Sequence, residues 1–450
     1  MKGSTIALFL KVLPCIFLFG ASAIAADIVL RKAPPLTVYR TPDYPENLAR
    51  YHFGADVKAT PESAPVVKLR LSTNGEDENT SAAALLCDDP TTGYQIPAGA
   101  SSIVVSLPNI ENIQSVSFLN DGAQGNLTIS ISNADVPDNS PEWHQVEKGN
   151  MKPGAVVAKI GPGEAKYVKL SFNTAHPGRI AAFGVFATPA LSDFAMPRPR
   201  KVSFEAGSAS FALINSNYSE VHAKARGLYV SSGDLNRVND MIDDQAATTY
   251  QFASGDPAPT AVIDLGRERN LSRLSAIYAA QPGSVDFYVL RTLPTGTVTE
   301  ESGVQQVANV EQRADLPQSL TIRQEAFADL KPVGSVLSNG QGRASVDFPE
   351  AVGRYIMIEW HPASRRGEAF SIAQVAAFGP AERTRGSARQ FANNERRDGK
   401  ETFDGKTILD NKDIPAEGPA EAQAPAEGPP PALPPVPPFT FIPQVPPTSP

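Results

Sequence analysis

The sequence has 450 residues, and its 41% hydrophobic and 20% charged residues are typical of a globular protein, which excludes a wholly disordered chain. Acidic residues outnumber basic ones by 48 to 40, giving a formal net charge of −8. This balance argues against nucleic acid and against an anionic membrane as the main partner. Once a leader and a tail are set aside, residues 26–380 remain, enough for two domains with a core each.

The start of the chain has the pattern of an export signal. Lys2 precedes an apolar run over 6–19, and Ala23-Ile24-Ala25 provides a cleavage site. An N-terminal membrane anchor is the alternative, but Lys11 interrupts the run, which is shorter than the roughly 20 residues that a membrane span needs. We expect a cleaved signal peptide over 1–25 and a bacterial protein exported to the periplasm or cell surface, or secreted, without a transmembrane segment after cleavage.

Comparison of the two halves of the chain reveals an internal repeat. Residues 86–94 resemble residues 242–250, since each segment has an Asp-Asp pair, then Thr, then Tyr. Segments of alternating apolar residues follow in the same order: 103–107, 116–118, 127–131 and 165–172 in the first half, and 261–266, 274–278, 285–289 and 353–360 in the second. Both halves end on apolar residues that match at a constant offset of 192: Ile180, Phe183 and Phe186, and Ile372, Val375 and Phe378.

Most of these segments alternate with a period of two and are separated by Pro, Gly, Asn and Asp, which is typical of short antiparallel strands in a sandwich or barrel. Residues 66–71 and 227–230 are expected first strands of the two copies. Helical turns are expected only near 81–86 and 240–242. The sequence therefore predicts an all-β protein with two tandem copies of one fold.

Two further segments differ in composition from the repeats. Residues 189–201 combine prolines with basic residues and are expected to form the linker between the copies. The tail from 381 is polar and then proline-rich, with 14 prolines in the last 36 residues. Such a segment has few backbone N–H groups for pairing in a sheet and few apolar side chains to bury. We therefore expect it to be extended or disordered and to serve as a spacer or as a docking peptide.

The order of motifs in the second copy resembles the discoidin domain, the coagulation-factor C-type module of the galactose-binding-like superfamily. The motifs are Asp243-Asp244, Thr248-Thr249-Tyr250, the strand end Ile263-Asp264-Leu265-Gly266, and Arg354-Tyr355-Ile356. The first copy is degenerate, because Ser106-Leu107-Pro108 replaces Asp-Leu-Gly. The resemblance implies two jelly-roll β-sandwiches: a degenerate one over 26–188 and a discoidin-like one over 202–380, followed by a disordered tail over 381–450.

The resemblance also implies a structural calcium ion beside the Asp-rich turn. The candidate ligands are Asp243, Asp244 and Thr248 in the second copy and Asp88 and Asp89 in the first, because carboxylates and hydroxyls suit a hard cation. The alternative is that these aspartates cap the turn through hydrogen bonds to its backbone.

Carbohydrate-binding members of the resembled family use loops at one end of the sandwich that supply His, Arg and an aromatic. The candidate ligand-binding residues are His361, Arg365 and Arg366 in the second copy and His176 and Arg179 in the first, beside two His-Pro pairs. Histidine and arginine can donate to hydroxyls. The alternative is that His-Pro forms a turn and that the neighbouring Trp360 belongs to the core.

No sequence motif for catalysis is present. The five histidines lack zinc-site spacing, and neither a nucleophile elbow nor a phosphate-binding loop occurs. Cys87 lies among apolar residues and is expected to be a small buried hydrophobe. We expect an exported, non-catalytic protein that recognises carbohydrate. The alternative is a structural or assembly protein of the cell envelope that binds partner proteins through the sandwiches and the tail.

Overall fold

Antiparallel strands account for most of the described chain, as the alternation with period two predicts. The computed structural model describes residues 27–64, 69, 71, 81–189, 198, 216–294, 316–323, 329–364 and 369–379. The predicted signal peptide, the predicted tail, and most of the linker and of the strand expected at 66–71 lie outside these ranges. Within the ranges, no helix is long and apolar enough to cross a membrane.

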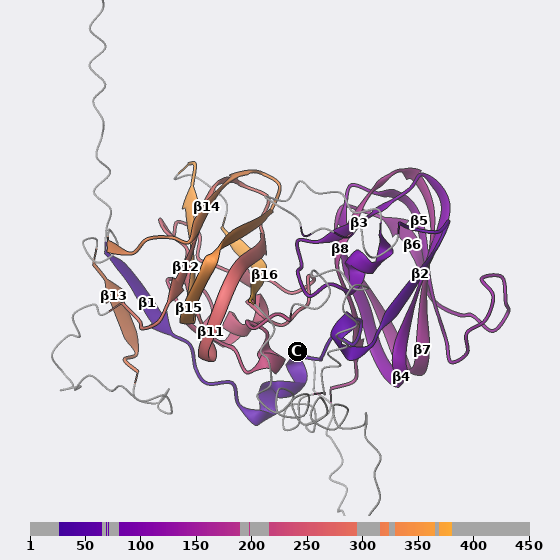
Figure 1. Ribbon diagram of the computed structural model, residues 1–450, viewed down its shortest axis with the longest axis horizontal. Helices are drawn as coiled ribbons and strands as arrows, with labels where there is room; N and C mark the ends of the chain where they lie inside the picture. The colour runs from indigo at the N-terminus through magenta and orange to yellow at the C-terminus, as the bar shows by residue number, and fades with distance from the viewer. Residues whose placement is uncertain are drawn as a thin grey trace, which may run out of the picture. The chain divides into compact units, whose positions relative to one another are not determined.

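The first copy forms a seven-stranded sheet in the order β3-β8-β4-β7-β5-β6, and β2 pairs with β4 outside this row (Figure 1). The strands are β2 (Asp56–Thr60), β3 (Gly93–Ile96), β4 (Gly99–Asp121), β5 (Gln124–Ser132), β6 (His144–Met151), β7 (Gly154–His176) and β8 (Gly178–Ala187).

The second copy forms a nine-stranded sheet in the order β13-β1-β9-β11-β15-β12-β14, with β16 paired to β11 and β10 paired to β16. The strands are β1 (Ile28–Lys32), β9 (Arg226–Val230), β10 (Tyr250–Gln251), β11 (Thr260–Tyr278), β12 (Pro282–Leu290), β13 (Ser319–Ile322), β14 (Gly334–Asn339), β15 (Arg343–Pro362) and β16 (Ser371–Phe378). The helices are short 3₁₀ turns: η1 (Val38–Asp43), η2 (Tyr51–Phe53), η4 (Ala82–Leu86), η5 (Val221–Ala223) and η6 (Leu235–Met241).

Both sheets have the same order of pairing. The row β3-β8-β4-β7-β5-β6 corresponds to β10-β16-β11-β15-β12-β14, and β2 pairs with β4 as β9 pairs with β11. Tyr94 pairs with Ile180, and Tyr250 pairs with Ile372, so the turns and final strands align at the predicted offset. The all-β fold class with two tandem β-sandwiches is therefore confirmed.

Long bent strands join the two layers of each sandwich, a feature that the sequence analysis missed. Residues 103–107 and 116–118, expected as separate strands, belong to the single strand β4, and 261–266 and 274–278 belong to β11. The first half of β11 pairs with β9 and the second half with β16, with a register shift between Asp264 and Arg269. An irregularity of this kind bends the strand, so that one strand serves both layers around a shared core.

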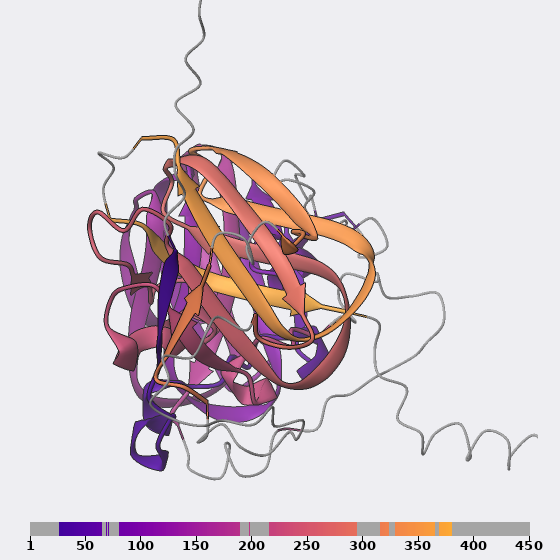
Figure 2. The same cartoon turned by 90° about the vertical axis from the view of Figure 1, so that its left-hand side faces the viewer.

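The strand β1 lies in the range predicted for the first copy but pairs with the sheet of the second. Arg31 pairs with both Val230 of β9 and Ser319 of β13. In Figure 2 the indigo β1 runs beside the orange β13 at the edge of that sheet. The pairing gives the edge of β9 a partner, whereas β2, its counterpart in the first sheet, pairs only with β4 among the described residues. Residues 1–382 accordingly form one compact unit.

Two motifs of the second copy are joined by a buried ion pair. Arg354 donates from Nε and Nη2 to the two carboxylate oxygens of Asp264, over 2.9 and 3.0 Å. The same carboxylate accepts from the backbone N–H of Gly266, whose φ of +80° suits glycine. The ion pair thus joins the Asp-Leu-Gly motif to the Arg-Tyr-Ile motif, and Asp264 has a structural role.

The aromatic after each Asp turn is part of the core. Tyr250 is 1% exposed, packs edge-to-face on Phe252, and donates its hydroxyl hydrogen to the carbonyl of Ser232. Tyr94 is also buried, but no hydrogen bond of its hydroxyl is present among the described residues. Cys87 is buried as expected, and burial raises the pKa of its thiol.

The two tyrosines give a matched test of this structural role. Tyr250→Ala is expected to lower the free energy of unfolding by about 3–4 kcal/mol, because it leaves a large cavity. Tyr250→Phe is expected to cost about 1 kcal/mol for the lost hydrogen bond, whereas Tyr94→Phe should have little effect. Urea denaturation of the three variants measures this. Equal stability of Tyr250→Ala and the unmodified protein would contradict a core role.

Candidate functional site

The first candidate region is the Asp turn of the second copy, where Asp243 caps the backbone. Its Oδ1 accepts from the N–H of Gln245 at 3.0 Å, and its Oδ2 accepts from the hydroxyl of Thr248 at 2.6 Å. Burial raises the pKa of the Asp243 carboxyl, and these hydrogen bonds oppose that shift. The geometry is that of a side chain closing its own turn, which is the alternative considered for this motif.

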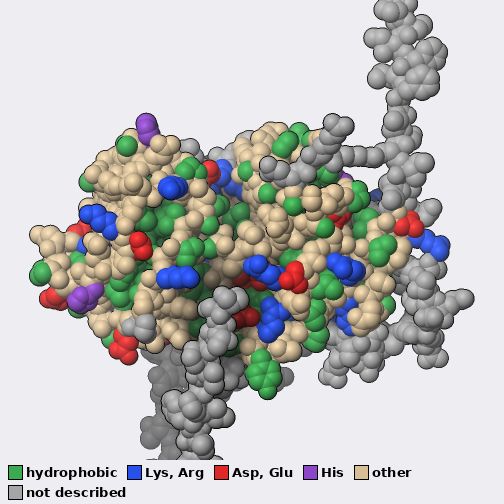
Figure 3. All heavy atoms as spheres, turned by 180° about the vertical axis from the view of Figure 1, so that it is seen from behind, with side chains coloured by type: hydrophobic (Ala, Val, Ile, Leu, Met, Phe, Trp, Pro, Cys, Tyr) green, Lys and Arg blue, Asp and Glu red, His purple; other side chains and the backbone are tan. Residues whose placement is uncertain are grey.

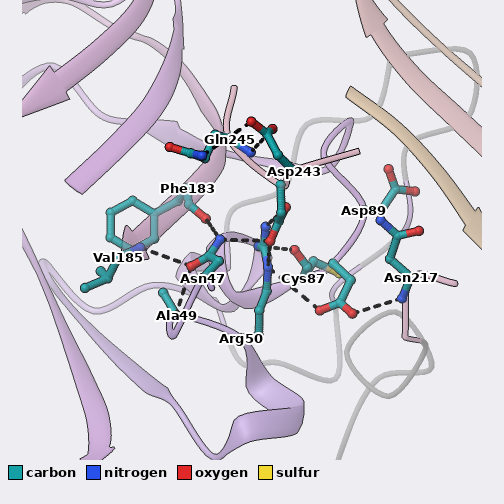
Figure 4. Close-up of polar contacts among 12 residues, drawn as sticks. Asn47, Ala49, Arg50, Cys87, Asp89, Phe183, Val185, Asn217, Asp243 and Gln245 are labelled. Carbon is teal, nitrogen blue, oxygen red and sulfur yellow. Dashed lines mark hydrogen bonds and ion pairs between the residues drawn. The ribbon is translucent and has the colours of Figure 1, made fainter. Parts of the chain in front are cut away.

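The side chain of Asp244 binds Asn47 and Arg50 of the first copy, two residues that Figure 4 labels. Its carboxylate accepts from Nε of Arg50 at 2.8 Å, from Nη2 of the same residue, and from Nδ2 of Asn47 at 3.0 Å. A φ of +59°, which aspartate tolerates better than most residues, aims the side chain there. Arg50 also donates to the carbonyl of Cys87, so it ties both turns together.

The Asp turn of the first copy makes the reciprocal contacts. Asp89 accepts from Nε of Arg273 at 2.7 Å and from the hydroxyl of Ser275 at 2.9 Å, both on β11 of the second copy. Asp88 accepts from the backbone N–H of Asn217 at 3.0 Å and lies 3.1 Å from Nδ1 of His52. Each copy therefore supplies a buried carboxylate to cations of the other half of the chain.

The carboxylates proposed as calcium ligands are thus already engaged by protein donors. Calcium at the turns remains a prediction. If Asp243, Asp244 and Thr248, or Asp88 and Asp89, held calcium, the ion would raise the melting temperature and Asp243→Ala would abolish the increase. Thermal melts with calcium and with EDTA measure this, and identical melting temperatures in both would contradict the prediction.

Several residues of this network belong to a second repeat, which the sequence analysis did not find. Asn47 and His52 recur as Asn217 and His222 at an offset of 170, each next to a 3₁₀ turn. The side-chain oxygen of Asn47 accepts from the N–H of Val185, and that of Asn217 accepts from Ala377, 192 residues later. The same spacing of Asn and His before each Asp turn could have revealed this repeat in the sequence.

The two carboxylate partners of Arg273 allow a controlled test of the contact between copies. The Asp89 side chain is 1% exposed, whereas that of Asp347, the other partner, is 57% exposed. Asp89→Ala is expected to cost about 3–5 kcal/mol of unfolding free energy, because it leaves a buried guanidinium with a lost partner. Asp347→Ala is expected to cost less than about 1 kcal/mol. Equal costs in urea denaturation would contradict a buried role for Asp89.

The predicted carbohydrate contacts of the first copy do not come together. Arg179 is buried and donates to the carbonyl of Thr91, and burial lowers its pKa to about 10. His176 is exposed at the end of β7. In the second copy Arg365 and Arg366 lie outside the described residues.

His361 lies within β15 rather than in a loop, and belongs to a cluster of polar side chains. Its Nε2 is 3.1 Å from Oδ2 of Asp286 and 3.5 Å from Oε2 of Glu359. The hydroxyl of Tyr288 donates to Oε2 of Glu359 over 3.3 Å. The sequence analysis missed Asp286 and Glu359. The alternation of β12 and β15 could have revealed these two residues, because Val285 and Trp360 face the core and their neighbours along each strand face outward.

Burial and charge shift the pKa values in this cluster. The pKa of Glu359 is raised to about 7, mainly by burial and to a smaller extent by the nearby Asp286, while His361 and the hydrogen bond from Tyr288 oppose the shift. The hydrogen bond between His361 and Asp286 raises the pKa of the imidazole and lowers that of the carboxyl. The imidazole is therefore stabilised in its protonated form and Asp286 in its ionised form.

The cluster lies in two rows on the outer face of the second sheet. Asp286 pairs with Glu359 on one side and with Ser335 on the other. In the next row, Ser284 pairs with His361 and with Leu337, whose side chain is 74% exposed. Neighbouring side chains on one face of a sheet lie within contact distance.

The aromatic residue next to His361 takes no part in this surface. Trp360 is buried and stacks on Phe370, with ring centroids 4.5 Å apart. This is the alternative reading, in which Trp360 belongs to the core.

The first copy lacks the cluster. At the paired positions of β5 and β7, Thr128 lies opposite Ser171, and Asn126 lies opposite Asn173. The structural counterpart of His361 is therefore Asn173, and not His176 as the two His-Pro pairs suggested. The second copy alone carries this arrangement of charged groups among the described residues.

No protein-family model matches the sequence, and no curated protein is similar to it. Among solved structures the chain resembles chitosan-binding module 1 derived from a chitosanase/glucanase of Paenibacillus, with 20% identity over 32% of this chain and 99% of that chain, at a TM-score of 0.25. It resembles a fucolectin from striped bass serum at 12% identity, over 75% of this chain and 99% of that chain, at a TM-score of 0.24.

A third similar structure is a GH29 fucosidase of Ruminococcus gnavus, with 16% identity over 32% of this chain and a TM-score of 0.24. The match spans 27% of the length of the fucosidase. These likenesses are of fold alone.

Proposed function

We propose that this protein is an exported, non-catalytic carbohydrate-binding protein, and that its binding surface is the outer face of β12, β14 and β15. The observation that carries the proposal is the imidazole of His361, which is 43% exposed and held by Asp286, with the exposed Leu337 in the same row two strands away, across Ser284. Figure 3 shows acidic, basic and hydrophobic side chains interspersed over the face of the molecule seen from behind Figure 1.

The chemistry of these side chains suits a sugar ring. An imidazole donates to a hydroxyl oxygen and a carboxylate accepts from a hydroxyl hydrogen, so His361 and Asp286 can serve two neighbouring hydroxyls. The exposed aliphatic side chain of Leu337 can cover the C–H face of the same ring. Sites for small ligands combine an apolar wall with a few placed polar groups in this way.

The proposal that the protein is not an enzyme depends on the burial of Glu359. Its side chain is 4% exposed and lies against Tyr288 and His361. Glycoside hydrolysis needs two carboxyl groups on either side of the scissile bond. An almost fully buried carboxyl group is poorly placed to flank a bond in a bound sugar, and this supports the proposal of binding without cleavage.

Two of the similar structures are a chitosan-binding module and a fucolectin. The proposal depends on the side chains described above and not on those likenesses. Export to the periplasm or cell surface is proposed from the leader pattern of residues 1–25.

A glycan array followed by calorimetry tests the proposal. The purified protein is expected to bind a defined set of glycans, and His361→Ala is expected to weaken binding at least about tenfold, the loss of one charge-assisted hydrogen bond. His176→Ala removes an exposed histidine from the other copy and should leave binding unchanged. Background signal on all glycans, or an equal loss in both variants, would overturn the proposal. Recovery of an envelope protein as the specific partner would favour a role in assembly.

A further inference from the structure

We infer that Asp286, Glu359 and His361 bind a divalent transition-metal ion of the zinc type on the outer face of the second sheet. The inference concerns the same surface as the proposed carbohydrate site, but it depends only on the geometry and charge of the three side chains. The metal site and carbohydrate binding are therefore independent proposals, and a negative result for one does not decide the other.

The spacing of the donor atoms fits one ion. One ligand atom from each residue lies within 4.8 Å of the other two. The Nε2 of His361 is 3.1 Å from Oδ2 of Asp286 and 3.5 Å from Oε2 of Glu359. Tetrahedral zinc with bonds of about 2.1 Å holds its donors about 3.4 Å apart. The imidazole nitrogen already faces both carboxylates at close to that separation.

The charge of the cluster favours a cation. Within the described part of the chain, His361 is the one cationic group paired with Asp286 and Glu359. Two carboxylates therefore share a single imidazole, although the Glu359 side chain is almost fully buried. Burial of an unbalanced carboxylate is costly. A divalent ion would offset both charges and accept the neutral imidazole as a ligand.

Neighbouring groups orient the ligands. Tyr288 donates to the carboxylate of Glu359, and Ser335 hydrogen-bonds to that of Asp286. Metal-binding carboxylates are typically held by such outer hydrogen bonds. The strands add rigidity, because Asp286 and Glu359 are directly paired and His361 follows two residues later on the same face.

The donor set distinguishes between metals. One imidazole nitrogen and two carboxylates suit zinc and its transition-metal neighbours. Calcium takes six to eight oxygen ligands, more than this cluster offers, and magnesium prefers oxygen alone. Three protein ligands leave a coordination position on the half-exposed side of His361, where water or a ligand hydroxyl could bind.

The corresponding positions of the first copy, Thr128, Ser171 and Asn173, offer no charged donor. The site is therefore expected once per chain.

The test uses the untagged, full-length protein after EDTA and dialysis. Titration calorimetry with zinc chloride is expected to show one site per chain, and cobalt(II) is expected to give the visible absorption bands of a tetrahedral site. Glu359→Gln and His361→Gln should each weaken zinc binding at least a hundredfold and abolish the cobalt bands. Tyr288→Phe, which removes the hydrogen bond to Glu359 but none of the three ligands, should weaken it about tenfold. His176→Ala is the matched control and should bind as the unmodified protein does.

Melting curves without metal show whether each variant is folded, and for folded variants the titrations are decisive. Absence of zinc binding, or zinc binding that survives Glu359→Gln and His361→Gln, would overturn the inference. Glycan arrays run with zinc and with EDTA separate the two proposals. Zinc binding without any glycan signal overturns the proposed function alone, and glycan binding without zinc binding overturns the metal site alone.

Discussion

The reciprocal exchange of buried carboxylates between the two halves is the interaction on which the rest of the structure depends. Asp244 of the second turn binds Arg50, and Asp89 of the first turn binds Arg273. Burial of such ion pairs has a high desolvation cost. Their main contribution is to the specificity of the arrangement, because any other arrangement of the two halves would leave a buried charge unpaired. Together with the β1 strand, they turn two sandwiches into one compact unit.

This exchange decides where ligand chemistry can take place. Because the aspartates of both turns accept hydrogen bonds from protein donors, the turns serve the contact between the copies. The outer face of the second sheet is different, since Asp286, Glu359 and His361 face one another with a half-exposed imidazole. The two copies share one fold, but the charged residues of β12 and β15 in these rows correspond to uncharged residues of β5 and β7 in the first copy.

Much of the fold could be predicted from the sequence, because strand periodicity and the order of motifs are local patterns. The offset of 192 aligned Ile180 with Ile372, and these residues pair with Tyr94 and Tyr250 as equivalents. The site could be predicted only in part. His361 was identified through its His-Pro pair, but the same reasoning selected His176, whose strand position does not match.

The sequence by itself determined the class of fold and the presence of two copies, because these follow from alternation and repetition along the chain. Only the tertiary structure decided what the charged residues do. Asp89 binds Arg273, 184 residues away along the chain, and Asp286 binds His361, 75 residues away. A carboxylate has the same local pattern whether it caps a turn, binds a guanidinium or faces an imidazole, and strand register brings the partner to it.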